Sequence, residues 1–307
     1  MRDSIGAILR PGSGGRKGRL RVAEGGLVVA LLLMAAIAWS PFSPLPFAAG
    51  LRFVLVAAGL AAVALLLGEQ PGGVRYWLRE LLPTPFIPYT FLSLGVLIPS
   101  VNPRVADALL MGWDERLLGR ELQTALYSMP LPSWSVDILS LAYSSFFFLP
   151  LTLVVVLAWR RDPQIARVSA TIVLTFMVSY TGYFLVPAYG PRTTVAKHRW
   201  ESLPHGLVGG RLRMLLDEME STKTDAFPSG HTMVTLATLL CARRRARDVF
   251  DALLPIGSLL IAATVLLTYH YLVDLLAAVP FLVASWWLSA WLAGPVSPRV
   301  ASEPSSA

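Results

Sequence analysis

The chain has 307 residues, of which 55% are hydrophobic and 15% are charged, and its formal net charge is +7. Soluble globular domains carry about 25% charged residues, so this composition excludes a soluble protein and indicates one embedded in a membrane. The positive residues cluster in short connections between apolar segments, and no nucleic-acid recognition motif accompanies them. We therefore expect no nucleic-acid partner. The single cysteine, Cys241, excludes an intramolecular disulfide.

The apolar segments predict an all-α, polytopic transmembrane helical bundle of about six to eight spans. The expected spans cover residues 25–42, 50–68, 84–101, 137–159, 166–186, 230–242, 252–269 and 272–293. The third of these contains three prolines and is shorter than the roughly 20 residues that a span usually needs. A re-entrant segment is therefore the alternative at that place.

The same segments predict four regions along the chain. Residues 1–24 are basic and glycine-rich, and we expect a disordered cytoplasmic tail; a cleaved signal peptide is the alternative, although no small-residue cleavage site clearly follows the first apolar run. Residues 25–136 hold N-terminal membrane spans followed by amphipathic interfacial helices. Residues 137–293 are the expected catalytic membrane core. Residues 294–307 are rich in Pro and Ser and are expected to form a disordered tail.

The distribution of charge predicts an orientation. If the N-terminal tail is cytoplasmic, so are the connections that contain Arg75, Arg160 and Arg243–Arg247, as the positive-inside rule requires. The loop of residues 187–228 then faces outward, together with the turn at residue 270. This loop contains six Lys and Arg residues, which runs against the rule. Anion chemistry at the outer face would explain why these cations are there.

Pro228, Ser229, Gly230 and His231 directly precede an apolar segment. If that segment is a helix, its start presents free N–H groups, and such a helix start is an anion site. Gly230 lets a ligand approach the backbone closely, and His231 adds a proton donor at the same place. The run predicts a phosphate-binding helix N-terminus.

A second histidine, His270, is followed four residues later by Asp274. On a helix the two side chains would lie one turn apart on one face. A carboxylate beside an imidazole fixes its tautomer, and the other ring nitrogen is then available to attack. A nucleophile oriented by a second group is the general pattern of covalent catalysis. If the spans are right, this motif, the helix start at His231 and the Gly-Pro-Arg run at Arg192 share one outer face.

The Ser-Gly-His run, with a later His and an Asp four residues beyond it, resembles the type 2 phosphatidic acid phosphatase superfamily over about residues 140–290. The resemblance implies that His270 is a nucleophile that becomes a phosphohistidine. It also implies that Asp274 orients this nucleophile and that His231 protonates the leaving group.

For the substrate, the resemblance implies that Ser229 and the Gly230 amide bind phosphate oxygens, with Arg192 supplying positive charge. It implies neither a metal nor another cofactor. A metal site made of the two histidines and Asp274 is the alternative, since zinc takes imidazole and carboxylate ligands. The phosphate-binding context of the Ser-Gly pair argues against that alternative.

The chain departs from the phosphatase branch of this superfamily at two cation positions. Leu185 stands where that branch has a Lys, and Thr264 stands where it has an Arg. The local sequence looks more like the inositolphosphotransferase and sphingolipid synthase branches, which have an Asp four residues before the Ser, as Asp225 is here. We expect Asp225 to contribute to substrate binding, with a helix N-terminal cap as its alternative role.

The implied function is phosphoryl-group transfer on a lipid, by an integral membrane lipid phosphatase or headgroup phosphotransferase. The expected substrate is a lipid phosphate or a phospholipid, and the acceptor is water, an alcohol or a polyol; the shared motifs do not say which. A lipid-phosphate transporter or binding protein without turnover is the alternative, although no paired interrupted spans are found. The expected location is a bacterial inner membrane, with the site facing the periplasm.

Overall fold

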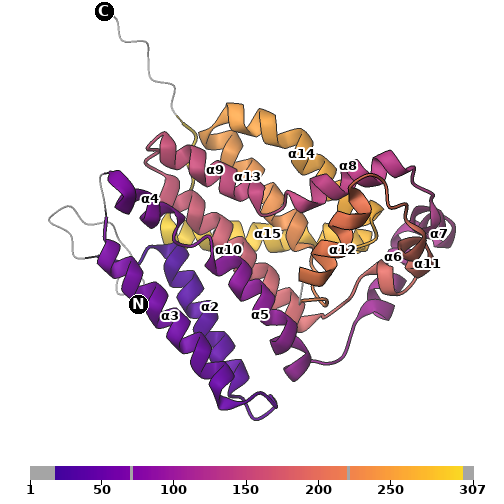
Figure 1. Cartoon of the computed structure of the whole chain (residues 1–307), viewed down its shortest axis with the longest axis horizontal. Helices are drawn as coiled ribbons and strands as arrows, with labels where there is room; N and C mark the ends of the chain where they lie inside the picture. The colour runs from indigo at the N-terminus through magenta and orange to yellow at the C-terminus, as the bar shows by residue number, and fades with distance from the viewer. Residues whose placement is uncertain (1–17, 70–71, 220–221, 300–307) are drawn as a thin grey trace, which may run out of the picture.

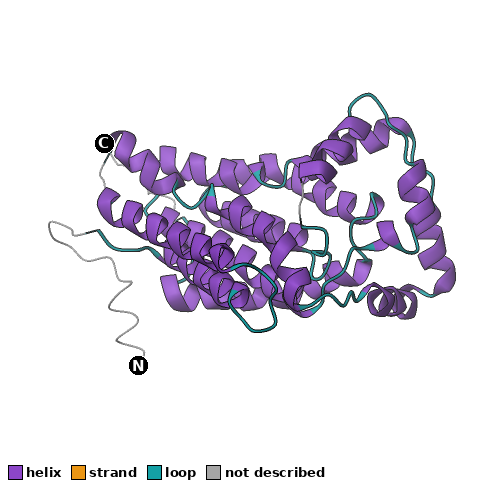
Figure 2. Cartoon of the chain, turned by 60° about the horizontal axis from the view of Figure 1, so that its bottom comes forward, coloured by secondary structure: helices purple, strands orange, loops and turns teal. Residues whose placement is uncertain are grey.

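The computed structural model of the protein describes residues 18–69, 72–219 and 222–299. Residues 1–17 and 300–307, which belong to the two predicted tails, lie outside the described part. The described residues form helices joined by loops and include no β-strand (Figure 2). The prediction of an all-α bundle is confirmed.

The N-terminal part of the chain forms four helices on one side of the bundle (Figure 1). They are α2 (Val22–Ala38), α3 (Phe47–Leu67), α4 (Gly73–Leu81) and α5 (Phe86–Val101). Helix α2 packs against both α3 and α10 (Ile165–Leu185). Leu27, Leu31 and Ala35 recur every four residues on α2 and are all buried, because this spacing places them on one face of a helix.

Two short helices follow, α6 (Asp107–Leu118) and α7 (Arg120–Ser128). They occupy the segment expected to be amphipathic and are separated by Gly119, whose positive φ of 76° ends the first of them. Helices α8 (Ser133–Ser144) and α9 (Phe148–Trp159) come next and meet at an angle of 49°. Figure 1 shows α6 and α7 at the far end of the molecule from α2 and α3.

The remaining helices surround α13 (Gly230–Arg245), which packs against α9, α10, α14 and α15. Helices α14 (Arg247–Leu266) and α15 (Leu272–Ala293) are joined by the short turn that contains His270. The loop between α10 and α13 contains a 3-10 turn, η1 (Pro191–Thr193), and two helices, α11 (Lys197–Ser202) and α12 (Gly209–Met219). This loop is therefore mostly ordered and covers the end of the bundle where α13 begins.

Five helical segments of the described chain are long and apolar enough to cross a membrane, or six if the bent α8–α9 pair is one span. They are α3, the α4–α5 segment, α10, α14 and α15. Helix α4 extends the third expected span to 29 residues, so that segment is long enough to cross. The first and sixth expected spans correspond to α2 and α13, which have 17 and 16 residues, fewer than the roughly 20 that a bilayer requires.

The arginine-rich connections gather at one end of the bundle, which we call the basic end. Arg160 pairs with Asp248 at 2.5 Å, and Arg245 pairs with Asp162 at 2.8 Å, so the connections that follow α9 and α13 lie side by side. Helices α10 and α13 run between this end and the opposite one. The three sequence motifs therefore lie together at the end opposite the arginines, as the charge pattern predicts.

Candidate active site

Two histidines face each other at the end of the bundle opposite the basic end. His231 lies in the first turn of α13, and His270 lies in the turn between α14 and α15. The Nε2 atom of His270 is 3.4 Å from the Nδ1 atom of His231. The two residues are buried, at 2% exposed for His270 and 7% for His231. The fold thus brings together the two histidines singled out by the sequence.

A backbone carbonyl fixes the tautomer of His270. The Nδ1 atom lies 2.7 Å from the carbonyl oxygen of Ala226, and a carbonyl oxygen only accepts hydrogen bonds. Nδ1 therefore carries the proton, and the neutral ring has its lone pair on Nε2. Because Nδ1 of His231 faces that lone pair, it can donate a proton toward it. Nε2 of His270 is the nitrogen placed for attack.

Asp274 lies beside His270, but its shorter contact is to the backbone. Its Oδ2 atom is 3.5 Å from Nδ1 of His270 and 2.8 Å from the backbone nitrogen of Tyr271, which donates to it. The expected placement of His270 and Asp274 one turn apart on a single helix is wrong, because α15 begins only at Leu272. His270 precedes the helix, where its ring reaches the Ala226 carbonyl. Ala226 thus has the closer contact with Nδ1.

Ser229 is the N-terminal cap of α13. Its hydroxyl oxygen accepts hydrogen bonds from the backbone N–H and the hydroxyl of Thr232, at 3.2 and 3.0 Å. Its own N–H donates to the Asp274 carbonyl oxygen at 3.1 Å, which ties the start of α13 to the start of α15. Since Ser229 caps the helix, the alternative role of Asp225 as its N-terminal cap is wrong.

The start of α13 is packed too tightly for any residue but glycine at position 230. A Cβ atom there would lie 2.0 Å from the hydroxyl of Tyr183. The amides of Gly230 and His231 come before the first intrahelical hydrogen bond, which Met233 donates. This helix start therefore has the donors that an anion needs, next to the histidine pair.

Arg192 follows α10 in a loop that packs on the turn of His270. Its backbone N–H donates to the Thr268 carbonyl at 3.0 Å. Its guanidinium lies 5.0 Å from the ring centre of Tyr269 and 5.8 Å from that of Trp200. Asp217 lies 3.8 Å from its Nη1 atom. Arg192 is 7% exposed, so its charge acts in a site with little access to water.

Asp225 connects the loop of Arg192 to the stretch that leads into α13. It pairs with Ala188 in an isolated parallel β-bridge. Burial raises the pKa of its carboxyl group, and the positive charge of Arg192 opposes that rise. Asp225 is 7% exposed, so its carboxyl group is buried next to the backbone of Ala188. Its carboxyl group belongs to the same buried polar cluster.

Aromatic rings pack against the imidazole of His231. Tyr143 stacks on its imidazole with ring centres 4.6 Å apart, and Phe146 lies at 4.1 Å. Tyr143 is itself stacked on Tyr269, at 4.2 Å. These contacts fix the plane of the His231 ring and keep water away from it, which strengthens any charge interaction at the pair.

Burial also lowers the pKa of His270, to about 4, so the ring is neutral and nucleophilic at neutral pH. The unfolded chain binds a proton at this residue below about pH 6.5, whereas the folded chain binds it only near pH 4. Stability should therefore fall as the pH falls through this window. We expect the melting temperature to drop more between about pH 7 and about pH 5 in the wild type than in His270→Asn. Equal drops would contradict the buried neutral state.

Two carboxylates of α6 hold the loops that bear Arg192 and His270, and sequence reasoning missed this role. Asp107 accepts hydrogen bonds from the backbone N–H groups of Tyr189 and Gly190, at 3.0 and 2.8 Å. It also accepts one from the hydroxyl of Tyr271, at 3.2 Å. Asp107 thereby joins the residues just before Arg192 to the residue just after His270.

The second carboxylate, Asp114, binds the backbone at the N-terminus of α15. It accepts hydrogen bonds from the backbone N–H of Val273 at 2.8 Å, that of Leu272 at 3.3 Å, and the hydroxyl of Tyr127 at 2.5 Å. The signal in the sequence is the spacing of seven residues from Asp107, which places both carboxylates on one helix face. That face is buried, since Asp107 and Asp114 are 5% and 0% exposed.

Asp114→Asn is expected to lower kcat about tenfold to a hundredfold, because an amide NH₂ would oppose the N–H donors that hold the turn after His270. KM should change much less, since the carboxylate of Asp114 holds the backbone of the turn after His270. The matched control is Glu115→Gln, which changes the neighbouring carboxylate on the exposed side of α6. A kcat that falls equally in both variants would contradict a positioning role for Asp114.

The two positions at which cations are missing differ in the structure. Leu185 is 73% exposed at the end of α10, whereas Thr264 is fully buried and its carbonyl accepts the N–H groups of Tyr269 and His270. Two other cations of the loop, Arg199 and Arg213, are buried. Arg213 lies 5.3 Å from the ring centre of Trp200, which Arg192 also contacts. The ring of Trp200 therefore contacts both guanidinium groups.

No group of three or more His, Cys, Asp or Glu side chains suited to a metal ion occurs among the residues that the structure describes. Within the pair, Nδ1 of His270 is bonded to the Ala226 carbonyl and Nε2 faces His231. The pair therefore offers a nucleophilic nitrogen and a proton donor side by side to a group that binds next to it. A tetrahedral phosphoryl group is of that kind.

The sequence model of the PAP2 superfamily matches residues 110–288, which is more than half of the chain. A PA-phosphatase related-family protein of Dictyostelium discoideum is 27% identical over 169 residues, covering 48% of this chain and 30% of that relative. The chain thus matches less than a third of the relative's length. No solved structure gives a significant match. The match of the superfamily model includes every candidate site residue, and the chain belongs to the PAP2 superfamily.

Proposed function

We propose that this protein is a lipid phosphatase or headgroup phosphotransferase that works through a phosphohistidine at His270. The observation that carries the proposal is the histidine pair. The Ala226 carbonyl holds the proton of His270 on Nδ1, and Nε2 faces His231 across 3.4 Å. The helix start at Gly230 and the guanidinium of Arg192 supply positive charge for phosphate oxygens.

In the first step, Nε2 of His270 attacks phosphorus, and the bond from phosphorus to the lipid alcohol oxygen breaks. His231, as an imidazolium, gives a proton to that oxygen and becomes neutral, so the leaving group departs as a neutral alcohol. In the second step, water or an acceptor alcohol attacks the phosphohistidine. His231 takes the proton of the attacking group, the P–N bond breaks, and His270 returns to its neutral form. Phosphoryl transfer of this kind depends mostly on positioning and charge stabilisation.

Water as acceptor makes the protein a phosphatase, and a lipid alcohol or polyol makes it a headgroup transferase, as in the inositolphosphotransferase branch. The absence of a cation at Leu185 and Thr264 supports transfer, because a phosphodiester carries less negative charge than a phosphomonoester. The arginines of the basic end support a cytoplasmic position for that end under the positive-inside rule. The histidine pair would then lie at the outer face of a bacterial inner membrane.

Product analysis in mixed micelles tests this proposal. A phosphomonoester lipid and then a phospholipid would each be supplied with and without an alcohol acceptor, with His270→Asn as the blank. Free phosphate without acceptor identifies a phosphatase, and a new phospholipid that needs the acceptor identifies a transferase. Blank-level release from every substrate would contradict catalysis and support binding or transport of lipid phosphate.

Arg192→Gln is expected to raise KM and lower kcat/KM about a hundredfold, because a buried cation on the phosphate would be lost. Arg192→Lys keeps the charge but not the planar donor pair, so we expect partial recovery. The steady-state rates of the three proteins with one phosphomonoester lipid check this. A glutamine variant as active as the lysine variant would show that the charge at Arg192 does not bind substrate.

A further inference from the structure

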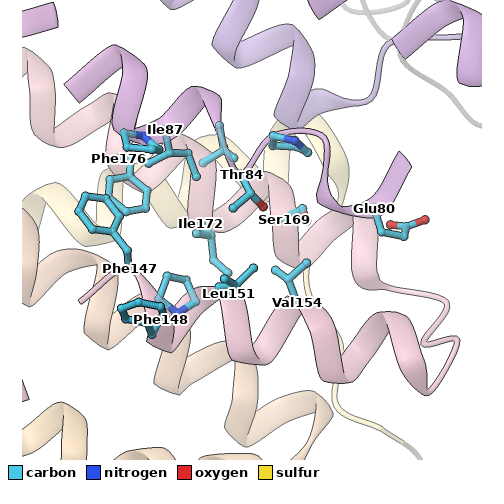
Figure 3. A pocket seen from close by; sticks show the side chains of 14 residues that line it. Glu80, Thr84, Ile87, Phe147, Phe148, Leu151, Val154, Ser169, Ile172 and Phe176 are labelled. Carbon is cyan, nitrogen blue, oxygen red and sulfur yellow. The ribbon is translucent and has the colours of Figure 1, made fainter. Parts of the chain in front are cut away.

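An apolar cavity of about 250 Å³ lies beside the candidate active site, between α9, α10 and the segment that joins α4 to α5. Figure 3 shows Phe147 and Phe176 at one end of the cavity and Glu80 at the other. Resting on the function proposed above, we infer that this cavity holds a hydrocarbon chain of the substrate lipid while its phosphate lies at the histidine pair.

A short chain of aromatic ring contacts links the cavity wall to the site. Phe176 and Phe147 line it, and their ring centres lie 5.6 and 4.9 Å from that of Phe146. Phe146 in turn lies 4.1 Å from His231. One ring therefore separates the proton donor of the proposed reaction from the end of the cavity. A hydrocarbon chain that extends from the phosphate past Phe146 would reach the cavity.

The direction of the cavity also suits a lipid. Its lining runs from Phe147 to Val154 on α9, and from Phe176 back to Ser169 on α10, both away from the histidines and toward the basic end. Seven residues of helix span about 10 Å. A lipid whose phosphate lies at one membrane surface has its chains directed toward the middle of the bilayer, which is the same direction.

The far end of the cavity offers no unsatisfied charge to a polar ligand. Glu80 accepts two hydrogen bonds from the guanidinium of Arg21, at 2.7 and 2.9 Å, and is 3% exposed. The walls are otherwise mostly aliphatic or aromatic, so a hydrocarbon chain matches them. Phe148 lines the mouth and is 64% exposed, which lets a lipid enter sideways from the bilayer.

One wall of the cavity lies outside the part of the chain that the superfamily model matches. Pro83, Thr84, Ile87 and Pro88 belong to the segment between α4 and α5 or to the start of α5, whereas the match covers residues 110–288. The N-terminal helices therefore add a wall to the part of the chain that the superfamily model matches, and they would influence which hydrocarbon chains are accepted.

Leu151→Trp fills the cavity from α9 and tests the inference. We expect kcat/KM for a long-chain lipid phosphate to fall at least about tenfold, because the indole would clash with the chain. A short-chain, water-soluble phosphate ester should be turned over as by the wild type. The matched control is Val283→Trp, which places the same indole on the 58% exposed, lipid-facing side of α15 and should change neither rate. Unchanged long-chain turnover in Leu151→Trp would overturn the inference.

If Leu151→Trp loses both substrates through misfolding, Thr84→Trp makes the same test from the opposite wall. A second measurement does not need turnover: a long-chain lipid phosphate with a photoreactive group in its chain is cross-linked to wild type and variants. Labelling of residues 147–154 that Leu151→Trp abolishes and Val283→Trp leaves intact supports the cavity. Labelling that Leu151→Trp leaves unchanged overturns it. If the wild type is labelled there but turns over neither substrate, the proposed function fails and the binding site stands.

Discussion

His270→Asn is expected to lower kcat at least about 10⁴-fold, which is the scale of loss when a covalent nucleophile is removed. Asparagine can keep the hydrogen bond to the Ala226 carbonyl but has no lone pair where Nε2 of His270 lies. The fold should survive, since the new side chain is smaller and retains a donor. Phosphate release or lipid product formation, measured in the same mixed micelles, checks this.

The matched control for this variant is His198→Asn, which changes a histidine in α11 outside the pair. It should keep wild-type activity. Turnover in His270→Asn within tenfold of the wild type would place the nucleophile elsewhere. If His270→Asn loses activity and its melting temperature also drops strongly, His270→Gln is the replacement variant. Its longer side chain also removes the nucleophilic Nε2 atom of His270.

His231→Asn is expected to lower kcat about 10² to 10⁴-fold with a lipid alcohol as the leaving group, which is the usual range for a general acid. With a substrate whose leaving group is a nitrophenolate, the first step should be restored, because this group departs without a proton. The second step still lacks a base, so the phosphorylated enzyme should accumulate. Stopped-flow absorbance would show a burst of nitrophenolate followed by slow turnover.

His270→Asn provides the contrast, because an activated leaving group cannot replace a missing nucleophile. It should show no burst with either substrate. A burst in His270→Asn, or equal losses in His231→Asn with both leaving groups, would contradict the division of roles between the two histidines.

The sequence was sufficient to predict the helical bundle and the meeting of the three motifs at one end. Hydropathy marks the apolar segments, and the arginines after α9 and α13 mark one end of the helices, so the opposite end had to hold His231 and His270. What hydropathy could not tell was which apolar segments cross a membrane. Helix α13, the sixth expected span, is surrounded by α9, α10, α14 and α15 and is not one of the helices that are long and apolar enough to cross a membrane.

The local geometry of the site was harder to predict. A spacing of four residues suggests one helical turn, but His270 precedes α15, and Asp274 accepts the Tyr271 N–H in the first turn of that helix. A carboxylate in the first turn of a helix is commonly a backbone acceptor, so the sequence alone leaves both roles open. The hydrogen bond between His270 and the Ala226 carbonyl could not be predicted at all, because every residue type has a backbone carbonyl.

The contribution of α6 was hidden for a related reason. Asp107 and Asp114 stand among charged and apolar residues in a segment that is typical of an interfacial helix. Their burial depends on where α6 docks, which is a tertiary property. In the docked helix, both carboxylates accept hydrogen bonds from backbone N–H groups of the loops beside Arg192 and His270. Buried carboxylates seven residues apart are the pattern that could have indicated this role.

The most direct test of the account is to trap the covalent intermediate. His231→Asn would be mixed with a phosphate ester that has an activated leaving group, quenched in alkali, and digested for mass spectrometry. We expect one phosphate on the peptide that contains His270, stable in alkali and lost in acid. The His231→Asn, His270→Asn double variant should carry no phosphate. Phosphate on another residue, or a nitrophenolate burst without any phosphopeptide, would contradict a phosphohistidine at His270.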